Sequence, residues 1–350
     1  MGSKTNAGNF FEDFRLGQVF DHATPRTVTD GDIALYTALY GGRFAVQSSA
    51  AFAKSVGYAG QPVDDLLAFH VAFGKTVPEV SLNAVANLGY AEGIFGVPVF
   101  AGDTIRTSSK VIGLKENSNG KTGVVYVRST AVNQRGDMVV DYKRWVMVNK
   151  RDVAAPAPEA VVPDLKQVVD AADLVLPSGT DFKTYDTTLA GSGDLWGAYD
   201  IGEQIDHVDG CTVEDAEHMM ATRLYQNTAK VHFNQYLQAQ GRFGKRLVYG
   251  GHVISIARAV SFNGLANAFR VAAINAGSHA NPIFAGDTVF AWSEVLDKAE
   301  CAGRDDIGAL RLRTVATKDH PPADFPLKGD DGKYLPEVVL DLDYWVLMPR

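Results

Sequence analysis

The sequence has 350 residues, of which 46% are hydrophobic and 21% charged, and its formal net charge is −8. This length suits two domains of ordinary size, and the composition excludes a disordered chain. No apolar run reaches the roughly 18 residues that a membrane-spanning helix needs. The negative charge argues against nucleic-acid binding, which requires a basic surface.

The N-terminal segment lacks the apolar core of a secretory signal, so we expect a cytoplasmic protein. The two cysteines, Cys211 and Cys301, lie in no Cys-x-x-Cys motif and no Cys/His cluster. We therefore expect neither a disulfide nor a metal site.

The two halves of the chain repeat each other. The segment PVFAGDT at 98–104 returns as PIFAGDT at 282–288, and Tyr40 aligns with Tyr225. Further matches follow in the same order along the chain, which indicates an internal duplication. We predict an N-terminal unit at 1–150, a Pro/Ala-rich linker at 151–181 with a short helix near 165–173, and a C-terminal unit at 182–350.

Each unit is predicted to be α+β. A capped helix comes first, opened by Thr29 in one unit and by Thr212 or Glu214 in the other. An apolar segment follows whose helix would be buried on every side. Four strand-like segments come last, at 84–95, 103–115, 122–133 and 138–149 in the first unit, and at 268–279, 287–299, 309–317 and 338–348 in the second. Such an order predicts one buried helix wrapped by an antiparallel sheet in each unit.

One stretch of the second unit carries the polar groups suited to chemistry. In YQNTAKVHFN, Asn227 and His232 stand five residues apart, and RFGKRLVYGGHVIS follows with Gly250 and Gly251. The first copy has Gly42 and Gln47 at the positions of the polar pair. We therefore predict one active site per chain, with the first unit helping to hold the ligand.

These residues resemble the MaoC-like dehydratases and R-specific enoyl-CoA hydratases, which have the hotdog fold. The chain is most similar to mesaconyl-CoA (2-methylfumaryl-CoA) hydratases, also called β-methylmalyl-CoA dehydratases. The resemblance implies a tandem hotdog and a hydro-lyase that reversibly adds water to a branched C5 dicarboxylic acyl-CoA in ethylmalonyl-CoA or 3-hydroxypropionate-type carbon assimilation. This sequence departs from the motif at Asn227, where the hydratases have aspartate, at Ala229-Lys230 in place of Asn-Pro, and at Tyr249 in place of histidine.

Hydration of an unsaturated thioester needs a base for water, a proton for C2 and donors for the enolate oxygen. We assign the proton work to His232, because imidazole titrates near neutrality. Asn227 would orient the water, unless it is only a loop amide. Gly250 and Gly251 would offer backbone N–H groups to the thioester oxygen, although two glycines also suit a tightly packed helix start.

Four cations are candidate contacts for coenzyme A, namely Lys230, Arg242, Lys245 and Arg246. His252 is the second-choice imidazole, and His70 is expected in the core. No metal or organic cofactor is expected, since coenzyme A is part of the substrate. We also expect a homo-oligomer, although two hotdog units already make a pseudo-dimer.

Three alternatives stay open at this point. The substrate could be another short or medium enoyl-CoA. Asp64 or Asp65 could serve as nucleophile or base of a hotdog thioesterase. The chain could also bind acyl-CoA without catalysis.

Overall fold

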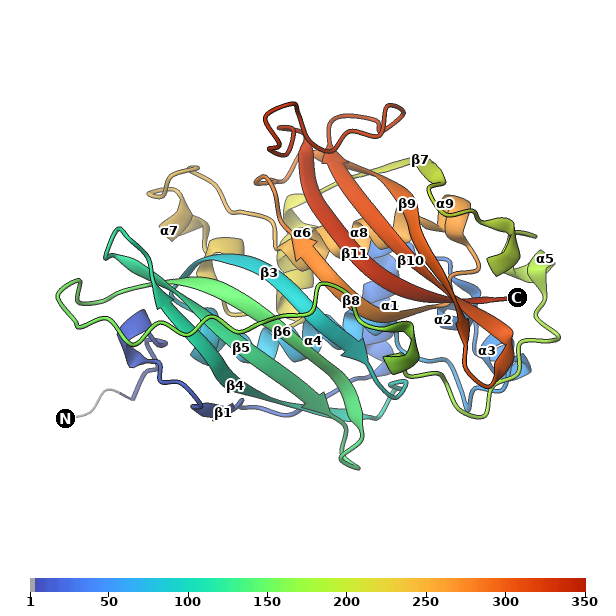
Figure 1. The fold of residues 1–350 in the computed structure, drawn as a ribbon, viewed down its shortest axis with the longest axis horizontal. Helices are drawn as coiled ribbons and strands as arrows, with labels where there is room; N and C mark the ends of the chain where they lie inside the picture. The colour runs from blue at the N-terminus through green and yellow to red at the C-terminus, as the bar shows by residue number, and fades with distance from the viewer. Residues whose placement is uncertain (1–3) are drawn as a thin grey trace.

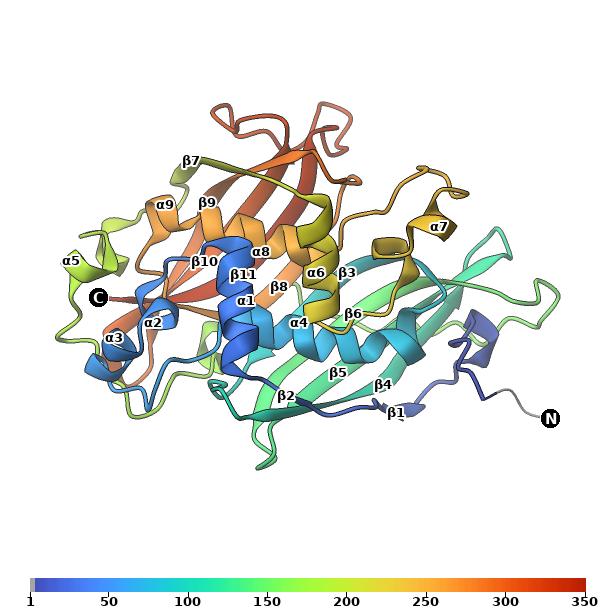
Figure 2. The same cartoon turned by 180° about the vertical axis from the view of Figure 1, so that it is seen from behind.

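The computed structural model describes residues 4–350 and consists of a curved antiparallel sheet with helices gathered on one of its faces (Figures 1 and 2). The described residues form an 11-stranded sheet in the order β1-β4-β5-β6-β3-β8-β11-β10-β9-β7, with β2 paired to β4. Within residues 4–350 no helix is long and apolar enough to cross a bilayer, and no group of His, Cys, Asp or Glu is placed to hold a metal ion. Both cysteines are free thiols.

The first half contributes six strands and the helices between them. The strands are β1 (Val19–Asp21), β2 (Arg26–Thr27), β3 (Ala84–Phe95), β4 (Thr104–Glu116), β5 (Thr122–Val132) and β6 (Met138–Asn149). The helices are α1 (Asp30–Tyr40), α2 (Ala45–Ser48), α3 (Ala50–Ser55) and α4 (Asp65–Thr76), with shorter turns at Phe11–Asp13 and Val77–Ser81.

The second half repeats this plan. Its strands are β7 (Gln204–Thr212), β8 (Arg270–Ser278), β9 (Thr288–Cys301), β10 (Arg304–Lys318) and β11 (Val338–Pro349). Its helices are α5 (Thr187–Ala190), α6 (Asp215–Leu224), α7 (Gln235–Gln238), α8 (Gly250–Val260) and α9 (Phe262–Leu265), and single 3-10 turns lie at Ala171–Asp173, Trp196–Ala198 and Lys230–His232. The helix predicted over 165–173 is therefore reduced to one turn at the end of that range.

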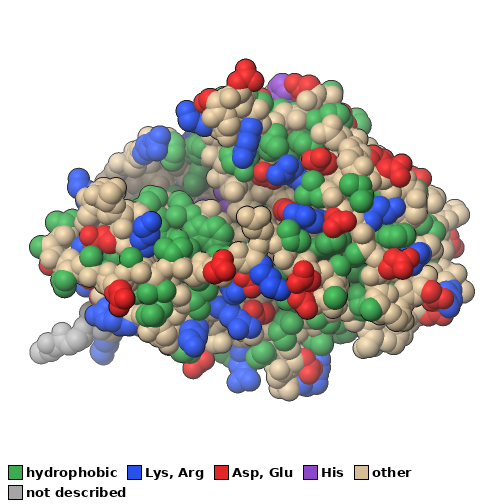
Figure 3. Space-filling view, viewed as in Figure 1, with side chains coloured by type: hydrophobic (Ala, Val, Ile, Leu, Met, Phe, Trp, Pro, Cys, Tyr) green, Lys and Arg blue, Asp and Glu red, His purple; other side chains and the backbone are tan. Residues whose placement is uncertain are grey.

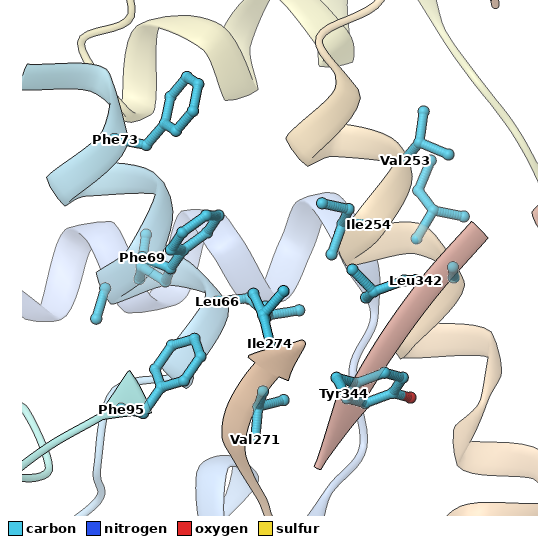
Figure 4. Close-up of a cluster of buried hydrophobic side chains, with 14 of the residues drawn as sticks. Leu66, Phe69, Phe73, Phe95, Val253, Ile254, Val271, Ile274, Leu342 and Tyr344 are labelled. Atoms are coloured by element: carbon cyan, nitrogen blue, oxygen red, sulfur yellow. The ribbon is translucent and has the colours of Figure 1, made fainter. Parts of the chain in front are cut away.

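The central helices α4 and α8 are buried, as their apolar sequences predict. Every residue of α4 from Leu66 to Thr76 is buried. Side chains of α4, α8, β8 and β11 pack into one core between the helices and the sheet (Figure 4). Because burying a large apolar side chain contributes about 1.5–3 kcal/mol, this core dominates the stability of both halves.

Helix α1 begins as its sequence indicates. The Thr29 side chain accepts from the Asp32 N–H while the Asp32 carboxylate accepts from the Thr29 N–H, so the two residues form a capping box. Helix α6 begins after Glu214, without a side-chain cap.

The two halves share one sheet because β3 pairs with β8 in antiparallel register. Ala91 lies opposite Ala276, and Ile94 lies opposite Ala273. Helices α1 and α6 cross the central helices α4 and α8 on the side that faces away from the sheet (Figure 2). A tandem hotdog therefore has its two units side by side, with the start of α8 close to the end of α4.

Candidate active site

The segment after α6 forms a tight loop against the central helix of the other half. Gln226 has a positive φ of 52°, and Asn227 is buried, with its Oδ1 accepting from the Ala229 N–H at 2.9 Å. A Cβ on Gly74 of α4 would lie 1.9 Å from the Tyr225 carbonyl oxygen. Gly74 therefore lets this loop approach α4, and the Asn227 amide nitrogen is the group left to hold another molecule.

His232 follows on the 3-10 turn at Lys230–His232. Its Nδ1 lies 2.9 Å from the Leu247 carbonyl oxygen, so Nδ1 carries the proton and Nε2 keeps its lone pair. Burial lowers the pKa of His232 to about 4, although its bond to Leu247 opposes that effect. At neutral pH this side chain is an uncharged imidazole with a free acceptor nitrogen, as a general base requires.

The start of α8 is built around two glycines. A Cβ on Gly250 would lie 2.3 Å from Cε1 of His279, and a Cβ on Gly251 would lie 2.6 Å from Cε1 of His70. Among the described residues, no side chain caps this end of the helix. The glycines thus make room for two imidazole rings beside a helix start whose backbone N–H groups suit a developing oxyanion.

His279 was missed by sequence reasoning, which placed it at the end of a strand without a role. Its Nε2 lies 3.2 Å from the Tyr90 hydroxyl of the first half. Burial lowers the pKa of His279 to about 4, and the nearby His232 adds to this effect. Two neutral imidazoles therefore share the site. No motif in the sequence signals the second one.

Tyr249, the residue before α8, joins these groups. Its ring centroid lies 5.4 Å from that of His232, and its buried hydroxyl has no partner among the described residues. The surface is hollowed between the α7 segment and strands β3 and β8, and a histidine side chain is visible inside the hollow (Figure 3). The hollow gives a ligand a route toward the end of β8.

The four candidate cations for coenzyme A lie along the loop outside this site. Lys230, Arg242 and Lys245 are exposed, and the latter two lie over the rings of Phe243 and Phe284. Arg246 differs from them, because its buried guanidinium forms an ion pair with Asp215. Three of the four are therefore open to a phosphate, and Arg246 is already paired.

The remaining candidate histidines and carboxylates hold the structure together. His252 Nδ1 lies 2.8 Å from the Tyr40 hydroxyl, and His70 Nε2 lies 3.1 Å from the Ser255 hydroxyl. Asp64 caps α4 by accepting from the Leu66 N–H, and Asp65 accepts from the Val271 N–H. None of these four side chains contacts His232 directly.

The corresponding place in the first half is nearly closed. Gly42, Phe44, Gln47 and Asp64 are among the residues that line a cavity of about 30 Å³ there, which has room for about one water molecule. Gln47 stands where the second half has His232, and its amide nitrogen donates to the Phe269 carbonyl at 2.6 Å. This cavity holds no imidazole.

Comparison with known proteins places the chain. The family model described as mesaconyl-CoA hydratase matches residues 2–324. The chain belongs to the mesaconyl-CoA hydratase family.

Two relatives of this family member match it over nearly their whole length. A β-methylmalyl-CoA dehydratase of Chloroflexus aurantiacus is 63% identical and matches 100% of this chain and 99% of its own. A mesaconyl-CoA hydratase of Cereibacter sphaeroides is 63% identical, and the match covers 99% of this chain and 100% of the relative.

Solved structures agree with the fold. A MaoC domain protein dehydratase from Chloroflexus aurantiacus superposes with a TM-score of 0.98 at 63% identity, covering 100% of this chain and 99% of that one. A Mycobacterium tuberculosis protein described as a double hotdog has a TM-score of 0.77 at 25% identity, and the match covers 98% of this chain and 99% of that one. The predicted α+β tandem hotdog is confirmed.

Proposed function

We propose that this protein is a hydro-lyase that reversibly adds water to the double bond of mesaconyl-CoA to give β-methylmalyl-CoA. Membership of the mesaconyl-CoA hydratase family, with two relatives of that activity at 63% identity, supports this function. The observation that carries the chemistry is the neutral His232 imidazole, held through Nδ1 with Nε2 free, beside the uncapped start of α8.

In the hydration direction, Nε2 of His232 takes a proton from water as the water oxygen bonds to C3. The C2=C3 electron pair moves toward the thioester, whose carbonyl oxygen becomes an enolate. The N–H groups of Gly250 and Gly251 stabilise this oxygen. Asn227 cannot accept a proton at neutral pH, so its amide nitrogen orients the water by donating a hydrogen bond to a lone pair of the water oxygen.

The proton for C2 must come from an acid in the site. His232 becomes that acid once it has taken the proton from water, and His279 is a second imidazole close enough for His232 to lower its pKa. No organic cofactor takes part in this scheme, because the thioester carbonyl itself accepts the electrons.

One assay separates this function from its rivals. Incubation with mesaconyl-CoA should decrease the enoyl-thioester absorbance without releasing thiol. Release of free thiol from a saturated acyl-CoA would instead identify a thioesterase, in which Asp64 or Asp65 would be the reactive group. Thermal stabilisation by acyl-CoA without either signal would indicate a binding protein.

The wider setting of the enzyme stays a prediction. We expect cytoplasmic location, assembly into a homo-oligomer, and contacts of Lys230, Arg242 and Lys245 with coenzyme A. Size measurement in solution and the salt dependence of substrate KM test the last two expectations.

A further inference from the structure

The first half holds a buried arginine that no carboxylate neutralises. Arg144 of β6 is 1% exposed, and its guanidinium lies over the Phe73 ring at 4.2 Å from the ring centroid. It donates to the hydroxyls of Thr76 at 2.7 Å and Ser81 at 3.3 Å, and to the Asn87 side chain at 3.4 Å. Its Nε has no hydrogen-bond partner among the described residues.

A buried cation without an anion is costly, so its retention needs a reason. Burial lowers the pKa of Arg144, and among the described residues the groups that oppose this effect are the hydroxyls of Tyr142, Tyr90 and Tyr249. Within residues 4–350, no Asp or Glu forms an ion pair with it. Within the described residues, the charge of Arg144 is therefore not balanced by a carboxylate.

Arg144 lies next to the candidate active site. Tyr90 is its partner across β3 and β6, and the Tyr90 hydroxyl contacts His279. Phe73, which carries the guanidinium on its ring, is 5.7 Å from the Tyr249 ring, and Tyr249 in turn contacts His232. Arg144 is thus linked to His279 through one aromatic side chain, Tyr90, and to His232 through two, Phe73 and Tyr249.

The second half also contains one arginine and one aromatic residue at these two positions, but in exchanged places. The duplication aligns Arg144 with Tyr344 and Phe73 with Arg258. Arg258 is also buried, but Tyr344 and, after it, the carboxylates of Asp64 and Asp65 oppose the fall in its pKa that burial causes. Asp64 aligns with Tyr249, so Arg144 has a tyrosine nearby where Arg258 has the carboxylate of Asp64.

We propose that Arg144 binds the free carboxylate of the substrate's acyl chain, and that it selects a dicarboxylic acyl-CoA over a monocarboxylic one. This inference rests on the proposed function, because it concerns the substrate of the same site. In mesaconyl-CoA the carboxylate is attached to C3, the carbon that water attacks, so it must lie close to the imidazoles. A guanidinium can meet a carboxylate with two parallel hydrogen bonds, and the unpartnered Nε–H is one available donor.

The test compares two substrates that differ only at this group. Mesaconyl-CoA carries the carboxylate, and (E)-2-methylbut-2-enoyl-CoA carries a methyl group in its place. We expect the parent enzyme to prefer the first substrate. Arg144→Met should lower kcat/KM for mesaconyl-CoA by about 10²–10⁴-fold and leave the methyl analogue within about tenfold. Arg144→Lys keeps the positive charge but loses the planar guanidinium with its paired donors. Its kcat/KM for mesaconyl-CoA should therefore lie between those of the parent and of Arg144→Met.

A binding measurement makes the test independent of turnover. Succinyl-CoA and butyryl-CoA have no double bond to hydrate, and they differ by the same carboxylate. Arg144→Met should lose the preference for succinyl-CoA that the parent shows. The matched control is Arg128→Met on neighbouring β5, because Arg128 is exposed and paired with Asp141, and it should keep the parent's preference.

The outcomes separate this inference from the proposed function. If the parent hydrates neither substrate, the proposed function is wrong. If the parent hydrates mesaconyl-CoA and Arg144→Met keeps its preference, or loses both substrates equally, the role of Arg144 is wrong and the function stands. Should Arg144→Met fail to fold, the Arg144→Lys variant decides by the same two ratios.

Discussion

The hydroxyl oxygen of Tyr40 lies 2.7 Å from the hydroxyl oxygen of Tyr225, and these two residues are the same position of the two halves, 185 residues apart. His70 and Ser255 are also 185 residues apart and also in contact, at 3.1 Å. Residues that contact their own equivalents must lie beside a two-fold axis. The offset of 185 residues that relates the two halves in the sequence therefore also relates the residues that meet at the axis of the pseudo-dimer.

Tyr40→Phe should destabilise the protein more than Tyr225→Phe. The Tyr40 hydroxyl lies at hydrogen-bond distance from both the Tyr225 hydroxyl and His252 Nδ1, and loss of the Tyr225 hydroxyl would leave the second of these bonds in place. Loss of the Tyr40 hydroxyl leaves two buried polar groups unpaired, at about 1–3 kcal/mol each. Denaturant unfolding of both variants measures the difference, and equal losses would contradict the network.

His232→Ala should lower kcat by about 10²–10⁴-fold in a folded enzyme, the usual effect of losing a general acid–base group. The ring nitrogen Nε2 has no substitute on the same turn. Steady-state kinetics with mesaconyl-CoA measures the loss, and circular dichroism checks the fold. Near-normal turnover would remove His232 from the mechanism.

Gln47→Ala is the matched change in the other half and should alter kcat little. Gln47 occupies the position of His232, but its amide is used to hold the Phe269 carbonyl. We expect some loss of stability and an unchanged rate. A rate loss comparable to that of His232→Ala would show that the first half is catalytic.

The acid limb of kcat/KM should lie well below the ordinary pKa of histidine. Burial holds the pKa values of His232 and His279 at about 4, so both stay neutral and active as the pH falls through 6. A pH–rate profile of the parent and of His232→Ala tests this expectation. An acid limb near the ordinary histidine value would mean that the site is wetter than the structure implies.

The free energy of unfolding should decrease as the pH falls below the ordinary histidine pKa. His70 and His252 have pKa values of about 3 in the folded state because they are buried. The unfolded chain binds protons below its histidine pKa of about 6.5, while the folded chain does so only at lower pH. The unfolded state therefore holds more protons between these values, and the free energy of unfolding decreases as the pH falls. Thermal unfolding between pH 7 and pH 4 measures the decrease and separates it from the rate effect.

Asn227→Ala should lose most activity, whereas Asn227→Asp should keep a measurable part. The Oδ1 of Asn227 holds the Ala229 N–H, and a carboxylate can replace that acceptor while an alanine cannot. Both variants are assayed with mesaconyl-CoA. If Asn227→Ala is as fast as the parent, another group orients the water.

The sequence predicted the fold well because its signals are local. Strands β3 and β6 have the predicted bounds, since they combine β-branched and aromatic residues with clear turns. Strand β7 was not predicted, and in the structure it is interrupted by Val208 at a φ of 63° and by a register shift.

The site was less predictable because its groups meet across the fold. His279 finds its partners in Gly250 and in Tyr90 of the other half, and no sequence spacing encodes either contact. In the sequence Arg246 is indistinguishable from its cationic neighbours, but in the structure it forms an ion pair with Asp215. The roles of Asn227, His232, Gly250 and Gly251 stay predictions that the variants above test.

The exchange of Arg144 and Phe73 for Tyr344 and Arg258 has an evolutionary meaning. In a homodimer of single units, one gene sets both copies of a position, so an arginine placed for one site also enters the other. Fusion into a single chain removes that constraint, because each copy then mutates alone. The first half was free to carry Gln47 in place of the histidine and to place Asp64 near Arg258 of the second half, while the other site kept His232 and left Arg144 without a carboxylate. Joining the two units in one gene thus allowed differences between their two sites to be encoded and inherited.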